Sequence, residues 1–417
     1  MSSRARDIVR KDDMSLEGLK VVEMGHSITA PYSSRLLAEF GAEVIKVEIP
    51  KCGDEARHCK PFLGDTPDLE KSGLFLCLNT GKLSITLDPS AVTGKKILYQ
   101  ILQQSDVFIE NYPRQQMETW ELDYAHLKEV NPNLAVISIS PYGDYGPYKD
   151  YKGYGISACA LGGWSQGNGE PGRDLLTAPF GIGHFLAGAM AALIALAVSI
   201  DVRQGGRGQF TDISEADCWI GLLTGSAIAG YVFSGLFKER TGRRVPGPYP
   251  RTTLPCKDGY FTMHAVQGYQ WKGFLEIMGD GEIPEWYAND PRFKDRAEAG
   301  RKYSDVLDAL LAPWMMSHTK KEIFELCRKK RIPFAPIMDI SEVMAEPHFD
   351  DRNYFIDVGI PEIGKFKYPG AAIRMSRTSC MTGRQAPRLG EHNVGIYHQR
   401  LGYSYEELAR LRAGGVI

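Results

Sequence analysis

Residues Gly18–Pro50 read GLKVVEMGHSITAPYSSRLLAEFGAEVIKVEIP, which is two short apolar runs separated by a segment with helical spacing. The first run surrounds Val21 and ends in a glycine, and the second extends from Ala42 to Val47. Between them, apolar residues recur every three or four positions, which predicts a helix through Phe40. The stretch therefore predicts a strand, a helix and a second strand, the repeating unit of an α/β fold.

The same order of elements repeats further along the chain. Apolar runs predict strands at Ser84–Asp88, Asp106–Asn111 and Leu134–Ser140, and helical spacing predicts helices at Thr93–Gln104 and Tyr124–Val130. Alternating strands and helices of this kind are typical of a parallel sheet with helices on both faces. We therefore expect an α/β domain with a Rossmann-like parallel sheet.

Two later stretches bear on the site and on the membrane question. Pro141–Tyr154 is rich in glycine, tyrosine and proline and follows the last predicted strand, where α/β sheets carry their ligand-binding loops. Phe185–Ile200 is apolar and rich in small residues, but it is shorter than the about 20 residues that cross a bilayer. We expect a loop at the first stretch and a helix buried inside the protein at the second.

Sequence character changes after this helix. Residues Gly242–Pro255 contain four prolines and several arginines, which is typical of an extended connection between domains. After it, GYFTMHAV predicts a strand, and the following residues to about Ile337 are mainly helical in pattern. This part predicts a smaller second domain, and Ser404 with glutamates behind it predicts a capped helix near the C-terminal end.

Composition and charge exclude several classes of protein. Of 417 residues, 43% are hydrophobic and 24% charged, as in ordinary globular proteins, and 49 basic against 51 acidic residues give a net charge of −2. No overall positive field would hold a nucleic acid or an anionic membrane, so we expect neither as a partner. The eight cysteines show no C-x-x-C pair and the first 14 residues lack the apolar core of a secretory signal. We expect no metal site, free thiols and a cytoplasmic location.

The sequence lacks the common catalytic motifs. The chain has no phosphate loop, no H-E-x-x-H, no G-x-S-x-G, and no G-x-G-x-x-G after the first predicted strand. His184 lies at the head of the apolar helix, where a structural histidine is the commoner finding and where the helix dipole favours the neutral imidazole by about 0.3–1 kcal/mol. From the residues alone, the protein is an α/β protein of unassigned activity.

Taken in order, several segments resemble the class III coenzyme A transferases. The resemblance rests on LEGLKVVEMG and the residues after it (Leu16–Arg57), LNTGKLSITLD (Leu78–Asp88), NPNLAVISISPYGDYGPYKD (Asn131–Asp150), GRGQFTDIS (Gly206–Ser214) and LGEHN (Leu389–Asn393). Each segment is weak alone, and their number and order make the resemblance specific. It covers nearly the whole chain.

The resemblance implies a fold and a chemistry. It implies a large Rossmann-like domain built from residues 1–220 and 339–417, linkers and a smaller α+β domain over residues 221–338, and two interlocked subunits. No cofactor is bound permanently, and a coenzyme A thioester is a substrate. In these enzymes an aspartate attacks the donor thioester, forms a mixed anhydride and then becomes an aspartyl-CoA thioester, from which the acceptor carboxylate takes the CoA.

This sequence departs from the family at the nucleophile. The family aspartate begins a D-x-x-x-G element shortly after a G-E-P turn; Gly169–Pro171 supply the turn, Gly188 supplies the glycine, and His184 occupies the aspartate position. An imidazole has no carboxyl carbon that could bond to the sulfur of CoA. The resemblance therefore implies no catalytic residue on this chain and a homologous partner subunit that carries the aspartate.

The resemblance also implies a degenerate CoA site. After VIKVE the family usually has a basic residue, whereas this chain has Ile49 and Pro50. Losing charge-assisted phosphate contacts of roughly 1.5–3 kcal/mol each weakens CoA binding. The residues to which the resemblance assigns CoA contacts are Thr29, Ala30, Leu78, Asn79, Asn111, Tyr112, Arg114 and Lys149.

Three functional hypotheses follow. The first is the non-nucleophilic subunit of a heteromeric CoA-transferase, with succinyl-CoA as donor, benzylsuccinate as acceptor and tyrosines of Pro141–Tyr154 lining the acceptor. The second is an active homodimeric transferase that uses another carboxylate, such as Asp174 or Glu170. The third is a non-enzymatic binding or scaffold protein on the same fold. The racemase branch of the family is disfavoured, because Gly153–Ile156 lacks its histidine–aspartate pair.

Overall fold

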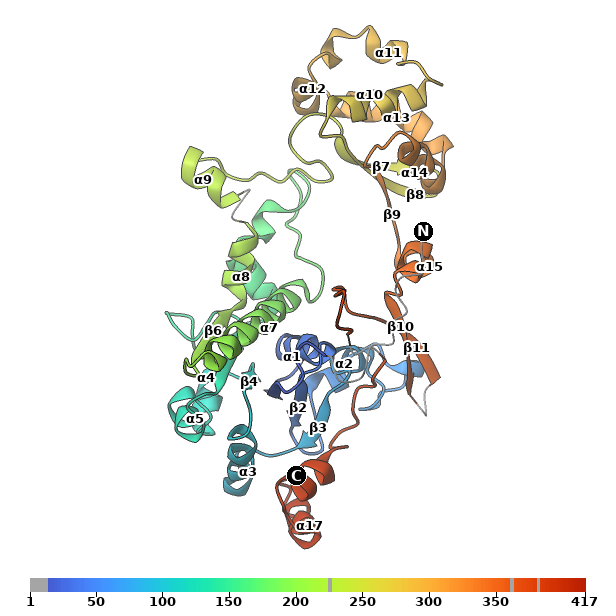
Figure 1. Cartoon of the computed structure of the whole chain (residues 1–417). Helices are drawn as coiled ribbons and strands as arrows, with labels where there is room; N and C mark the ends of the chain where they lie inside the picture. Colours follow the sequence, from blue (N-terminus) through green and yellow to red (C-terminus); the bar gives the residue numbers. More distant parts are fainter. Residues whose placement is uncertain (1–13, 224–226, 361–363, 381–382) are drawn as a thin grey trace. The chain divides into compact units, whose positions relative to one another are not determined.

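The computed structural model describes residues 14–223, 227–360, 364–380 and 383–417. The chain divides into a large unit, made of Met1–Trp164, Thr177–Gly235 and Asp350–Ile417, and a small unit, made of Ser165–Leu176 and Leu236–Phe349 (Figure 1). The first and the last described segments of the chain therefore belong to the large unit. The division into these two units falls after residues 235 and 349. The domain boundaries expected at residues 220 and 338 stay a prediction.

A parallel sheet of six strands, ordered β3-β2-β1-β4-β5-β6, forms the centre of the large unit (Figure 1). Its strands are β1 (Lys20–Met24), β2 (Glu43–Glu48), β3 (Leu83–Thr86), β4 (Val107–Glu110), β5 (Ala135–Ser140) and β6 (Phe210–Ser214). Every neighbouring pair is parallel, and Val22 of β1 lies between Ile45 of β2 and Phe108 of β4. The predicted Rossmann-like sheet is confirmed.

Helices cover both faces of this sheet. On one face, α1 (Thr29–Glu39) and α7 (Ile182–Arg203) form a core with Val21, Val44 and Ile109. On the other face, α3 (Val92–Leu102), α5 (Tyr124–Val130), a π-helical turn (Val394–Arg400) and α17 (Tyr405–Ala413) form a core around Val22 and Phe108. Because side chains alternate along each strand, Val21 and Val22 point to opposite faces of the sheet and pack in different cores.

Shorter elements complete the large unit. The helices are α2 (Gly73–Leu78), α4 (Arg114–Thr119), α6 (Gly155–Leu161), α8 (Glu215–Leu222) and α9 (Ala229–Ser234), and a two-stranded antiparallel sheet joins β10 (Phe355–Ile360) to β11 (Gly364–Pro369). As predicted, Ser404 caps α17: its side chain accepts the backbone N–H of Glu407, and the Glu407 side chain accepts the N–H of Ser404. The C-terminal segment thus packs as part of the large core.

The small unit is built on an antiparallel sheet with helices beside it, which confirms the predicted α+β class. The strands, in the order β7-β8-β9, are β7 (Arg251–Cys256), β8 (Gly259–His264) and β9 (Ala335–Ile337). The main helices are α10 (Gly268–Met278), α11 (Glu285–Ala288), α12 (Arg296–Lys302), α13 (Ser304–Ser317), α14 (Lys320–Lys329) and α15 (Ile340–Ala345). Trp271 and Phe274 are buried at the centre of its core.

The prediction of an extended connection over Gly242–Pro255 is wrong for its last residues, because they form part of strand β7. Thr252, Leu254 and Cys256 alternate with less buried neighbours along β7 and face the core of the small unit. Pro255 is tolerated because β7 is an edge strand.

The apolar helix is confirmed as α7, but the expectation that it is buried is wrong for one of its faces. Ala187, Ala191 and Ala195 are fully buried in the core with α1 and β5, whereas Met190 is 45% and Leu193 61% exposed. By length and composition α7 is the one described helix that could cross a membrane, which is weak evidence for a single helix. Since its alanine face packs on the sheet, we treat α7 as a core helix with a second, uncovered apolar face.

Candidate active site

The carboxyl edge of the large sheet brings two of the expected CoA-contact residues together. Asn111, directly after β4, donates from Nδ2 to the His26 carbonyl oxygen at 2.8 Å and to Thr29 Oγ1 at 2.8 Å. Its Oδ1 accepts the His26 backbone N–H at 2.9 Å. The loop after β1 is therefore tied to the loop after β4, at the edge where parallel α/β sheets bind ligands.

Tyr112 forms an aromatic wall beside this contact. Its ring lies edge-on to His26 and to Trp120, with 5.2 Å between ring centroids in each pair. Burial raises the pKa of Tyr112 to about 12, so its hydroxyl stays protonated at neutral pH. Tyr112 therefore contributes shape rather than charge.

Three other expected contact residues have their side chains inside the fold. Ala30, Leu78 and Asn79 are at most 2% exposed. Asn79 Oδ1 accepts from Lys82 Nζ at 2.7 Å, and Asn79 Nδ2 donates to the Phe75 carbonyl oxygen at 3.0 Å. These three residues offer almost no accessible surface to a ligand, and the assignment of CoA contacts to them stays a prediction.

A buried charge cluster, which sequence reasoning missed, supports the loop after β1. Lys46 Nζ lies 3.0 Å from Glu23 Oε1, 2.7 Å from Asp54 Oδ2 and 3.1 Å from the Gly25 carbonyl oxygen. Lys82 Nζ lies 3.2 Å from Glu23 Oε2, and burial lowers the pKa of Lys82 to about 8. The sequence contained one signal for this cluster, a lysine between Ile45 and Val47 in a predicted buried strand. Because charged residues are buried almost only when paired, such a lysine indicates a buried carboxylate partner.

Carboxyl groups form a second cluster, at the ends of β4, β5 and β6. Glu110 pairs in register with Ser138, and Ser138 pairs with Asp212. Burial raises the pKa of Glu110 to about 8, and burial together with the Asp212 charge raises that of Asp144 to about 6. The Asp144 backbone N–H donates to Asp212 Oδ2 at 2.9 Å. The Asp212 carboxylate therefore connects the loop after β5 to strand β6.

The loop Pro141–Tyr154 is irregular, as predicted, and exposes most of its tyrosines. Ring centroids are 6.1 Å apart between Tyr142 and Tyr148, and the second ring contacts Tyr151 at 5.2 Å. Arg114 forms ion pairs with Glu118 and, at 3.0 Å, with Asp150 of the loop, so its charge is already engaged. The other basic residue expected to contact CoA, Lys149, is exposed on the same loop.

His184 lies in the first turn of α7 and is bonded to a carboxylate that the sequence analysis overlooked. Its Nδ1 is 2.9 Å from Oε1 of Glu215, the first residue of α8, and Glu215 is 4% exposed. The overlooked signal is a glutamate directly after β6, in the segment TDISEADC. The two alternative carboxylates, Glu170 and Asp174, are exposed residues of the small unit.

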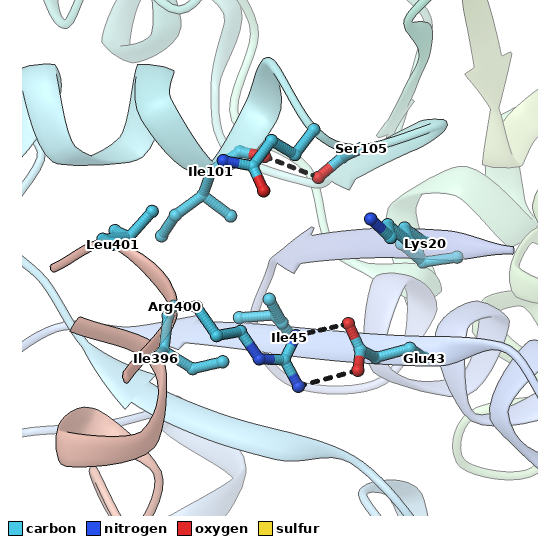
Figure 2. Close-up of a pocket in the computed structure, with 10 residues that line it drawn as sticks. Lys20, Glu43, Ile45, Ile101, Ser105, Ile396, Arg400 and Leu401 are labelled. Atoms are coloured by element: carbon cyan, nitrogen blue, oxygen red, sulfur yellow. Dashed lines mark hydrogen bonds and ion pairs between the residues drawn. The ribbon is translucent and has the colours of Figure 1, made fainter. Parts of the chain in front are cut away.

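Figure 2 shows a cavity at the opposite edge of the sheet, bounded by the amino ends of β1 and β2, the end of α3 and the turn Val394–Arg400. Its volume is about 170 Å³, and Arg400 reaches into it to bind Glu43, with N–O distances of 2.5 and 2.8 Å. Because ligand loops gather at the carboxyl edge, this cavity is not part of the candidate site. Among the described residues, no group of three or more His, Cys, Asp or Glu side chains could hold a metal ion.

Known proteins resemble this chain over nearly its whole length. The profile of CoA-transferase family III matches residues 16–393. Succinyl-CoA--D-citramalate CoA-transferase of Chloroflexus aurantiacus is 32% identical, over 96% of this chain and 98% of the relative. The Succinyl-CoA--L-malate CoA-transferase alpha subunit of the same organism is 29% identical, over 98% and 94%.

The fold agrees with this match. The crystal structure of a CAIB/BAIF family protein from Brucella suis superposes with a TM-score of 0.82 and 29% identity, over 93% of this chain and 99% of that one. The chain therefore belongs to CoA-transferase family III, whose members use CoA thioesters as substrates.

Proposed function

We propose that this chain is the non-nucleophilic subunit of a heteromeric class III CoA-transferase and that a homologous partner subunit carries the catalytic aspartate. The observation that carries the proposal is His184 at the start of α7, the position to which the family resemblance assigns the aspartate. A thioester intermediate needs a carboxyl carbon, which an imidazole lacks. The neighbouring carboxylate of Glu215 is bonded to His184 and buried, so it is poorly placed to attack an acyl-CoA.

Uncovered apolar surface supports an assembly of subunits. The outer face of α7 exposes Leu193 (61%) and Ile200 (56%), and α9 exposes Val232 (66%) and Phe233 (86%). Exposed apolar residues in such numbers on the helices of one chain are typical of subunit interfaces. The relative named as an alpha subunit supports a heteromer, and the interlocked arrangement expected from the family is part of the proposal.

Succinyl-CoA is the proposed donor, and an aromatic dicarboxylic acid, benzylsuccinate, is the proposed acceptor. Relatives are named for succinyl-CoA with dicarboxylic acids such as malate and glutarate. The tyrosines of Pro141–Tyr154 lie at the carboxyl edge of the sheet and offer ring faces to an aromatic acid.

A trapping experiment tests the division of labour. This chain and an aspartate-bearing homologue are purified separately and together, incubated with succinyl-CoA, and treated with hydroxylamine, which converts an aspartyl-CoA thioester to a hydroxamate. We expect CoA transfer only from the mixed assembly, and the modification on the homologue. Transfer by this chain alone, or a modified Glu170, Asp174 or Glu215, would support the homodimeric alternative and overturn the proposal.

The scaffold alternative predicts a different result. A mixed assembly that forms but transfers no CoA to any dicarboxylic acid tried, benzylsuccinate included, would favour a binding role for this chain. Native mass measurement of the assembly establishes the subunit ratio in the same preparation.

A further inference from the structure

His184 is held in one orientation by Glu215. The carboxylate of Glu215 can only accept a hydrogen bond, so His184 Nδ1, at 2.9 Å from Oε1, carries the proton of the neutral ring. The lone pair of that ring then lies on Nε2. The pair thus presents an imidazole nitrogen that can accept a proton.

Burial strengthens the influence of Glu215 on the ring. Glu215 is 4% exposed, and its Oε2 is a buried oxygen with no hydrogen-bond partner among the described residues. A carboxylate removed from water is costly unless a positive charge compensates it. Glu215 therefore stabilises the imidazolium that forms when Nε2 takes up a proton.

The other side of the ring is open. The His184 side chain is 25% exposed, and Nε2 makes no hydrogen bond within the described residues. Gly155, the first residue of α6, lies against it: a Cβ added there would stand 2.7 Å from Nε2. Glycine at this position therefore avoids a clash with the imidazole, and the accessible part of the ring is the quarter of the side chain that is exposed.

The surroundings favour negative charge that develops during a reaction. His184 is in the first turn of the 22-residue helix α7, and no side chain caps that turn. Its unused N–H groups and the helix dipole stabilise an anion nearby. A carboxylate-held base beside uncapped backbone donors is an arrangement that serves acyl transfer to water.

We propose that His184 and Glu215 form a general-base pair that hydrolyses acyl-CoA thioesters, an activity distinct from CoA transfer. Water attacks the thioester carbonyl carbon while Nε2 takes its proton; the tetrahedral oxyanion collapses, the C–S bond breaks, and the CoA thiolate takes the proton back from the imidazolium. The products are the free acid and CoA, so no other reactant is needed. The inference rests on the proposed function only for the acyl-CoA substrate.

Release of free CoA from succinyl-CoA, without an acceptor acid, tests the proposal. The preparation is the assembly of this chain with a homologue whose catalytic aspartate is replaced by alanine, so that the transfer route is absent. We expect hydrolysis in this assembly, with one oxygen from labelled water in the succinate. His184→Ala should slow it about 100-fold or more.

Two further variants separate a chemical role from a structural one. Glu215→Gln keeps the shape of the pair but removes its charge, and we expect hydrolysis to slow through a lower kcat at an unchanged KM, because the charge acts on the proton transfer rather than on binding. His126→Ala removes a surface histidine that pairs with Asp123 at 2.6 Å, and it should leave hydrolysis unchanged.

The outcomes distinguish this inference from the proposed function. Absence of hydrolysis, a rate that His184→Ala leaves unchanged, or a kcat that Glu215→Gln does not lower overturns the general-base pair, while transfer by the assembly with the intact aspartate still supports the subunit role. Conversely, hydrolysis that depends on His184, together with no CoA transfer by the assembly that keeps the intact aspartate, supports the pair and overturns the transferase subunit.

Discussion

At the scale of single residues, buried charge decides how the carboxyl edge of the sheet is built. Lys46 binds Glu23 and Asp54 where neither carboxylate meets water, and Glu110 is buried without a basic partner among its described contacts. The lysine cluster is compensated, and the glutamate is neutral until the pH approaches its raised pKa. The two clusters therefore respond differently to substitution and to pH.

Glu110→Gln should remove a pH-dependent loss of stability. Burial raises the pKa of Glu110 from 4.5 to about 8, so the folded state binds more protons than the unfolded state between these values, and stability falls as pH rises through that window. Urea unfolding at pH 5 and pH 8 should show a smaller difference in the variant. Glu129→Gln, an exposed change on α5, is the control; an unchanged difference in the Glu110 variant would refute this assignment.

Lys46→Met should destabilise the large unit by about 3–5 kcal/mol, because it leaves Glu23 and Asp54 buried without their cation. The free energy of unfolding from urea titration measures the effect. Lys128→Met, on the exposed side of α5, should change it little. A loss below about 1 kcal/mol would mean that Lys82 replaces the missing charge.

At the scale of elements, the close contact of α1 and α7 depends on small residues. A Cβ added to Gly188 of α7 would stand 2.7 Å from the Thr29 carbonyl oxygen of α1, and a backbone atom cannot turn away as a side chain can. This contact explains why residue 188 of this chain is a glycine. The same packing places His184 one turn earlier, at the edge of the sheet.

Gly188→Ala should therefore destabilise the chain by about 1–3 kcal/mol through overpacking between the two helices. Gly221→Ala in α8 is the matched control, since no described atom beyond its own helix backbone and chain neighbours lies within 4 Å of its added Cβ, and alanine is the better helix former by up to about 1 kcal/mol. Thermal unfolding measures both effects: the melting temperature should fall for Gly188→Ala and rise for Gly221→Ala. Equal effects would contradict the packing argument.

At the scale of the whole molecule, the uncovered face of α7 connects fold to assembly. An apolar helix with one face on the sheet and the other exposed favours a covering surface, and the proposed partner subunit would supply one. The expectation that this helix is buried inside the protein was wrong for its outer face. The hydrophobicity of a residue does not tell whether its own chain covers it.

Leu193→Asp should prevent assembly with the partner subunit and abolish CoA transfer, while circular dichroism of the isolated chain stays unchanged, because a buried unpaired charge at an interface is costly. Native mass measurement reports the assembly. Val92→Asp introduces the same charge at a 67% exposed residue that begins α3 and should assemble normally. Assembly of the Leu193 variant would show that α7 lies outside the interface.

The sequence alone determined the order of strands and helices, since alternating apolar runs and helical spacing are local properties, and α5 spans Tyr124–Val130 as predicted. Through the family segments, it also led to the proposal that His184 stands at the nucleophile position. Only the tertiary structure decided that Glu215 meets His184, 31 residues apart, that Asn111 meets Thr29, and that Asn79 is turned inward. The physical reason is that local patterns fix elements, whereas strand order and helix packing, which depend on long-range contacts, bring distant side chains to one edge of the sheet.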